Sequence, residues 1–141
     1  MKTIFEDIKK MFQWQDFRQV ADELMMHYDE SHIRCAISRH YYSLFGSTRQ
    51  YLINDKNLYE FNSRKNIHER IYRELINSND STEYELGEII GFLRKMRNHA
   101  DYDLGDDCLS YFEENLEKIL EDVETAFNSL NSLKVNPPYI V

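Results

Sequence analysis

No proline occurs before residue 137, and this absence constrains the fold more than any other feature of the sequence. The two prolines, Pro137 and Pro138, are adjacent and close to the C-terminus. Because proline ends or kinks helices, every earlier segment is free to form an uninterrupted helix. The chain also has only four glycines, too few for the many turns of a β-sandwich or barrel. We therefore predict an all-α fold.

The apolar residues recur at the three- and four-residue spacing of amphipathic helices. The predicted helices are a short one from Ile4 to Phe12, a second from Phe17 to Tyr28 after a break near Gln13–Gln15, and then Ser31–Ile53, Ile67–Ile76, Thr82 to about His99, and Cys108–Leu133. Thr82 and Glu85 have the spacing of a capping box at the start of the fifth segment. Together these patterns predict an antiparallel bundle of about four to five helices, with a single domain over residues 1–136 and a tail over 137–141.

Charge is distributed unevenly along the chain, which carries 17 Lys and Arg against 25 Asp and Glu, a net charge of −8. Residues 1–30 carry a net −3 and residues 106–141 a net −6, whereas residues 31–105 carry a net +1. A protein that binds nucleic acid over its whole surface is usually basic. Any phosphate contact is therefore expected in a local pocket that the middle segment supplies.

Several classes of protein are not expected from this sequence. The longest apolar run, Ile89–Leu93, is much shorter than a membrane span. Acidic Glu6 and Asp7 stand where a signal peptide would be apolar, so a cytoplasmic protein without a membrane partner is expected. The two cysteines have no Cys or His at ligand spacing, and no glycine-rich phosphate loop occurs. We predict no metal and no cofactor.

The stretch from residue 94 to residue 103 contains most of the side chains that can carry chemistry. Its candidates lie at the C-terminal end of one predicted helix, and they are Arg94, Arg97, Asn98, His99 and Tyr102. An Arg can bind a phosphate and neutralise developing charge, and a His can move a proton near neutral pH. These are the groups that metal-free RNA cleavage requires. The structural alternative is that the cations only stabilise the C-terminal end of a helix dipole.

Two segments of the sequence resemble the HEPN family of small helical domains, which includes ribonuclease toxins and nucleotide-binding proteins. The first is Ala36–Phe45, with Ser-Arg followed by Tyr-Tyr and Phe, and the second is Arg94–Asp103, which is similar to the family's Arg-polar-x-x-x-His region. Both occur in the family's order, and the resemblance covers roughly residues 15–130. It implies a homodimer in which two such regions meet in one cleft, with Arg39 and Lys95 as substrate-binding residues.

Two registers of the second segment remain open. In the first, Arg94 pairs with His99 at the family's spacing, but Lys95 replaces the usual polar residue. In the second, Arg97 and Asn98 have the right identities, but Tyr102 stands where the family has His. We favour His99, because a phenol with a pKa near 10 is a poor base at neutral pH. The resemblance to toxins of HEPN–MNT pairs implies a nucleotidyltransferase antitoxin as a partner.

Three functions follow from these patterns. The first is a metal-independent endoribonuclease, acting as a homodimer in a toxin–antitoxin or antiviral setting. The second is a non-catalytic HEPN domain that binds a nucleotide or a partner protein, and the third is a helical interaction module without a site. For the dimer we expect the Cys35, Ser38, Tyr42 and Gly46 side of the long helix and the Arg94 and Asn98 face to be partly covered by the second copy.

The remaining histidines and the tryptophan are interpreted as structural. His40 lies within the apolar stripe of its helix and is expected to be packed in the core. The side chains expected at the surface or at helix caps are His27, His32 and His68. Trp14 is expected to be a core anchor, and Tyr59 and Phe61 are the expected anchors of the polar, irregular segment Asn54–Asn66.

Overall fold

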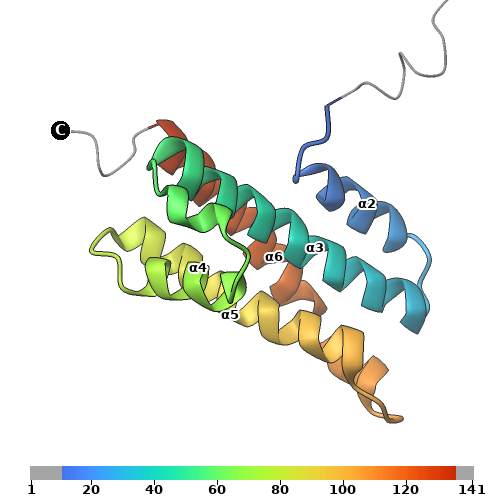
Figure 1. Cartoon of the computed structure of the whole chain (residues 1–141). Coiled ribbons are helices and arrows are strands. Elements are labelled where there is room, and N and C mark those ends of the chain that lie inside the picture. Colours follow the sequence, from blue (N-terminus) through green and yellow to red (C-terminus); the bar gives the residue numbers. More distant parts are fainter. Residues whose placement is uncertain (1–10, 136–141) are drawn as a thin grey trace, which may run out of the picture.

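The computed structural model describes residues 11–135, and within that range every regular element is a helix (Figure 1). The α-helices are α2 (Asp16–Leu24), α3 (Glu30–Gln50), α4 (Ile67–Ile76), α5 (Ser81–Tyr102) and α6 (Cys108–Val135). Two short elements lie between α3 and α4, the π-helix η1 (Tyr51–Asp55) and the 3-10 helix η2 (Tyr59–Asn62). The predicted all-α fold is confirmed. Of the predicted helix from Ile4 to Phe12, only Met11 and Phe12 are among the described residues, and they are not helical. The predicted tail over 137–141 lies wholly outside the described residues.

Helix α3 is the centre of the bundle and packs against α2, α5 and α6. Its predicted apolar stripe is buried, and so is the stripe's continuation into η1 at Tyr51 and Leu52. Near the start of α3, Arg34 Nη1 donates to the carbonyl oxygen of Ala100, close to the end of α5, over 2.9 Å. This contact sets α3 and α5 antiparallel, and α6 returns alongside α5 in the opposite direction (Figure 1).

Helices α4 and α5 approach closely because α5 has glycines where α4 side chains pack. A Cβ atom at Gly91 would lie 2.7 Å from Cε1 of Tyr72, and one at Gly87 would lie 2.8 Å from Cβ of Leu75. Neither position has room for a larger side chain without a shift of α4. Because they lack side chains, the two glycines allow α4 to pack closely against the helix that carries the candidate site.

The start and the end of α5 differ from the prediction. Asp80 is the N-cap, and its Oδ1 accepts a hydrogen bond from the backbone N–H of Glu83 over 2.9 Å. The predicted capping box at Thr82 and Glu85 is therefore wrong, because the first turn is already closed two residues earlier. Helix α5 continues to Tyr102, three residues beyond the predicted end, so His99 lies inside its last turn.

Helix α2 ends at Leu24, earlier than predicted, and Tyr28 lies outside it. The reason is that Asp29 serves as the N-cap of α3 and accepts from the backbone N–H of His32 over 3.0 Å, so the chain must leave α2 before it. Trp14, just before α2, is half-buried rather than part of the core, and its ring covers Gly46 of α3.

The side of α3 predicted to meet a second copy is partly covered by the same chain. Ser38 is only 5% exposed, and the Trp14 ring occupies the space in front of Gly46. That part of the predicted dimer surface is wrong, because α2 packs along the same side of α3. Cys35 remains exposed there.

Two further packing predictions have opposite outcomes. His40 is buried in α3, as predicted. Of the two aromatic anchors expected between α3 and α4, Phe61 is buried but Tyr59 is 63% exposed. Within residues 11–135 no helix is long and apolar enough to cross a membrane.

Candidate functional site

Helix α5 presents its candidate residues on different sides. At about 100° per residue, Arg94 and His99 are about 140° apart around the helix axis. Arg94 faces α4, Arg97 faces α3, and His99 faces α6. Lys95 and Asn98 are exposed between these directions. The described chain therefore does not bring either arginine into contact with His99.

Arg97 is a buried cation, with a side chain only 11% exposed. Its guanidinium carbon lies 5.3 Å from the ring centre of Tyr41 and 5.5 Å from that of Tyr42. The nearest carboxylate is Asp101, with Oδ2 3.6 Å from Arg97 Nη1, and Arg97 Nε has no hydrogen-bond partner among the described residues. Two aromatic faces and one carboxylate thus stabilise this charge. Arg97 is therefore buried too deeply in the bundle for its guanidinium to contact a phosphate at the surface.

Arg94 lies between α5 and α4, where its Nη1 is 3.1 Å from Oε2 of Glu69. Glu69 also accepts from Arg73 Nε over 2.9 Å. Hydrogen bonds from Arg73 and then from Arg94 lower the pKa of the Glu69 carboxyl. Arg94 shares this carboxylate with Arg73, and its side chain remains 34% exposed.

His68 belongs to the same region, although the sequence placed it at the surface or at a cap. Its Nδ1 is 2.6 Å from the hydroxyl of Tyr41, and its ring stacks on Phe45 with centres 4.2 Å apart. Burial, followed by the positive charges of Arg97 and Arg94, lowers the pKa of His68 to about 4. The available sequence signal was its position directly after Ile67 on a short amphipathic helix. That position does not reveal which helix His68 contacts.

Arg39, in α3, lies against the rings of Tyr42 and of Phe17 in α2. Its guanidinium carbon is 5.4 Å from the ring centre of Tyr42 and 5.0 Å from that of Phe17. Within residues 11–135 it forms no ion pair with a carboxylate. Tyr42 therefore contacts two arginines, Arg39 and Arg97, and Arg39 is the one with an uncompensated charge.

His99 has a separate environment at the interface of α5 and α6. Its Nδ1 contacts Oδ2 of Asp103, four residues later, and its ring packs edge-on against Tyr111 with centres 5.0 Å apart. These residues line a surface groove of about 430 Å³ together with Lys95. Because Nδ1 is engaged by a carboxylate, Nε2 is the ring nitrogen left for a substrate.

The predicted residues thus form two groups and an exposed remainder. One group, Arg94 and Arg97, lies with Tyr42 and His68 where α3, α4 and α5 meet. Arg39 also contacts Tyr42, but on the side of α2, where it lies over Phe17. The other group consists of Lys95 and His99 on the α6 side. Asn98 is exposed, and Tyr102 is 72% exposed. Asp103 was not among the predicted site residues, although its i+4 spacing from His99 on a helix was a usable signal.

No metal centre is evident in this part of the chain. Among the described residues, no three His, Cys, Asp or Glu side chains come together as a metal-ligand set. Cys35 is exposed and Cys108 is half-buried, and both are free thiols.

Comparisons with family models, curated proteins and solved structures find no match to this chain.

Proposed function

We propose that this protein is a metal-independent endoribonuclease of the HEPN type that acts as a homodimer. The observation that carries the proposal is the contact of His99 Nδ1 with Asp103 in a groove that Lys95 shares. A carboxylate on one ring nitrogen orients the imidazole and selects the tautomer in which the other nitrogen accepts a proton. The nearby ammonium of Lys95 supplies positive charge for a phosphate.

The proposed reaction is transesterification within the RNA strand. His99 Nε2 takes the proton of a ribose 2′-hydroxyl, and the 2′ oxygen forms a bond to the adjacent phosphorus. The bond from phosphorus to the 5′ oxygen breaks, and that oxygen takes up a proton. The products are a 2′,3′-cyclic phosphate and a 5′-hydroxyl end. Lys95 stabilises the charge that develops on the phosphoryl oxygens.

A second copy supplies what one chain lacks. Asn98 and Tyr102 lie on the exposed side of α5, and the half-buried Arg94 and His99 border that side. Packing of α5 against α5 about a two-fold axis would bring Arg94 of one protomer toward His99 of the other. Under this proposal Arg97 is a positioning residue, since it holds α5 against Tyr41 and Tyr42. A cytoplasmic toxin or antiviral role with a nucleotidyltransferase antitoxin remains part of the proposal.

A second function has one observation in its favour. Arg94 is bound to Glu69 and Arg97 is buried against tyrosines, so in each protomer both arginines already have structural partners. That arrangement favours a domain that binds a nucleotide or a partner without cleaving RNA. In that case Arg39, which has no carboxylate partner within residues 11–135, is the arginine available to a phosphate.

The test is a cleavage assay on mixed-sequence RNA with EDTA present, in which the end groups of the products are identified. His99→Ala should lower the cleavage rate by roughly 10²–10⁴-fold, the usual contribution of a positioned acid or base. His27→Ala is the matched control, because His27 is exposed and does not line the groove. Tyr102→Phe decides between the registers, and a loss larger than that of His99→Ala would favour the Arg97–Tyr102 register. Activity that survives both changes would overturn the proposal, and nucleotide binding without cleavage would support the second function.

A further inference from the structure

A groove of about 580 Å³ follows the first half of α3, between α2 and the C-terminal end of α5. It shares no lining residue with the groove that contains His99, and its volume is within the usual range of small-molecule sites. None of the described residues that line it is aromatic. Its walls include the side chains of Val20, Leu24, Cys35, Ser38, Arg39 and Ala100.

Three charged side chains line this groove, and only one of them lacks a partner of opposite charge. Nε of Arg34 is 2.9 Å from Oε2 of Glu30, and Oδ2 of Asp101 is 3.6 Å from Nη1 of Arg97. Arg39 is half-buried and forms no ion pair within residues 11–135. The groove therefore carries one uncompensated positive charge, which a small anion can neutralise.

A buried hydroxyl without a partner lines the groove beside that charge. Ser38 precedes Arg39 in α3, and it is 5% exposed. Its Oγ has no hydrogen-bond partner within residues 11–135, and it is not among the polar atoms that the protein encloses completely. The hydroxyl can therefore be reached from the groove that Ser38 lines. Because buried polar groups are normally paired, this hydroxyl points to a ligand that accepts a hydrogen bond.

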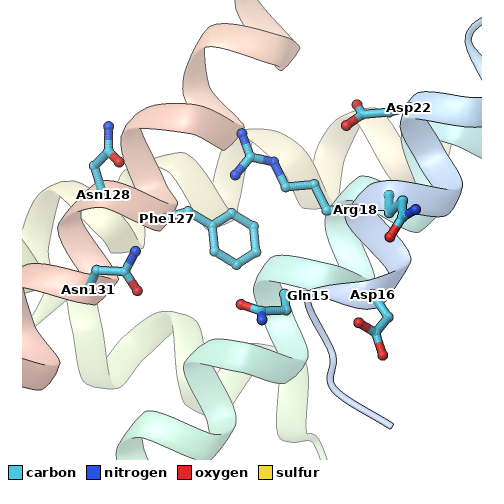
Figure 2. A pocket seen from close by; sticks show the side chains of 8 residues that line it. Gln15, Asp16, Arg18, Asp22, Phe127, Asn128 and Asn131 are labelled. Carbon is cyan, nitrogen blue, oxygen red and sulfur yellow. The ribbon is translucent and has the colours of Figure 1, made fainter. Parts of the chain in front are cut away.

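The groove between α2 and α6 has no such unpaired cation. Figure 2 shows Arg18 of α2 beside the ring of Phe127, and Arg18 is paired with Glu124. The other charged residues that line that groove are the carboxylates Asp16 and Asp22. It therefore does not attract an anion, and the unpaired Arg39 distinguishes the groove along α3.

We propose that the groove along α3 binds a small aliphatic carboxylate, of the medium-chain fatty acid class. The carboxylate accepts hydrogen bonds from the guanidinium of Arg39 and from the hydroxyl of Ser38. The aliphatic chain covers Val20, which is 41% exposed, and it packs against Leu24. A nucleotide fits this groove less well, because no aromatic ring lines it for a base to stack on.

The experiment is isothermal titration of the full chain with octanoate and, separately, with 1-octanol, which has the same chain length without the charge. Both titrations are run at 0.15 M salt, where charges beyond about 8 Å are screened. Octanoate should bind, and octanol should bind at least about tenfold more weakly. Arg39→Gln should weaken octanoate binding by about tenfold or more, the effect of losing a charge-assisted hydrogen bond. Ser38→Ala should weaken it too, and this variant is expected to fold because it removes only an unpaired hydroxyl.

Cys35 provides a second measurement that needs no substitution. Its thiol is exposed and lines the groove, whereas Cys108 does not line it. Bound octanoate should therefore slow the alkylation of Cys35 by iodoacetamide and leave that of Cys108 unchanged. Peptide mass spectrometry measures both rates in the same sample.

The matched control variant is Arg64→Gln, which removes one exposed positive charge outside the groove. Its affinity for octanoate should equal that of the unchanged protein. The inference is overturned if octanoate does not bind, if octanol binds equally well, or if Arg64→Gln weakens binding as much as Arg39→Gln. Equal alkylation of Cys35 with and without octanoate would also overturn it. None of these outcomes depends on RNA cleavage.

Discussion

The ring of Trp14 lies directly against Gly46, so that a Cβ atom on Gly46 would collide with the indole. This contact packs the segment just before α2 against the C-terminal half of α3. We predict that Gly46→Ala lowers the free energy of unfolding by about 1–3 kcal/mol, the usual cost of overpacking. Urea unfolding followed by circular dichroism measures it.

A double-mutant cycle provides the control for that prediction. In a Trp14→Ala background, Gly46→Ala should be neutral or should stabilise the protein by up to about 1 kcal/mol, since Ala favours a helix more than Gly does. If Gly46→Ala costs the same in both backgrounds, the contact with Trp14 is not the reason for the glycine.

Among the acidic residues, we expect substitution of Glu83 to lower the free energy of unfolding most. Its side chain is 2% exposed, its Oε2 is 2.9 Å from Lys56 Nζ, and the same oxygen accepts from the hydroxyl of Tyr51 over 2.8 Å. Glu83→Gln leaves the half-buried ammonium without its counter-ion, so we expect a loss of about 3–5 kcal/mol in unfolding free energy. The exposed neighbour Glu85→Gln should change it by less than about 0.5 kcal/mol. Equal effects of the two changes would contradict this account.

Stability should fall as the pH decreases below about 6.5, the ordinary pKa of histidine. Burial lowers the pKa of His40 to about 4 in the folded chain, so between these values the unfolded chain binds more protons than the folded one. The stabilising contribution is complete above pH 7 and is lost as the pH falls toward 4, by roughly 2–3 kcal/mol for His40. His68 changes in the same direction, because its pKa is also lowered to about 4.

The measurement is urea unfolding at a series of pH values between 4 and 8. His40→Gln should flatten the dependence in this window, whereas His27→Ala, which removes an exposed histidine, should leave its shape unchanged. A dependence of the same steepness in His40→Gln would assign the effect to other groups.

Arg97 and Arg94 should contribute differently to the free energy of unfolding. Arg97→Ala removes a side chain that packs on Tyr41 and Tyr42, and we expect it to lower the free energy of unfolding by about 1–3 kcal/mol. Arg94→Ala should change it by less than about 0.5 kcal/mol, since Glu69 keeps its bond to Arg73. Thermal unfolding by circular dichroism distinguishes them. A larger loss in Arg94→Ala would contradict the structural role given to Arg97.

The proposed dimer predicts a mass of about twice the 17.0 kDa of the chain in light scattering at micromolar concentration. Asn98→Arg adds like charge to the exposed side of α5, close to the proposed two-fold axis, and should shift the protein toward the monomer. Thr125→Arg, on an exposed position of α6, is the control and should not. A strict monomer in the unchanged protein would contradict the composite cleft.

Within the candidate site, sequence spacing predicted which residue types share the end of one helix but not what each of them contacts. Arg94, Arg97 and His99 do lie on α5, as the periodicity indicated. Their separation around the axis, about 140° from Arg94 to His99, also follows from helix geometry alone. The partners Glu69, Tyr42 and Asp103 did not follow from spacing alone, except that Asp103 lies one turn after His99.

The sequence by itself determined the helices, because helix formation depends on apolar periodicity and on the absence of proline over short stretches of chain. Ile67–Ile76 is helical over the predicted range, and α6 starts at the predicted Cys108. The tertiary structure alone decided that Arg97 is buried against α3, that His68 stacks on Phe45, and that Trp14 covers Gly46. The physical reason is that residue spacing sets angles within one helix, whereas the rotation of each helix against its neighbours is set by how side chains distant in sequence fill the shared core.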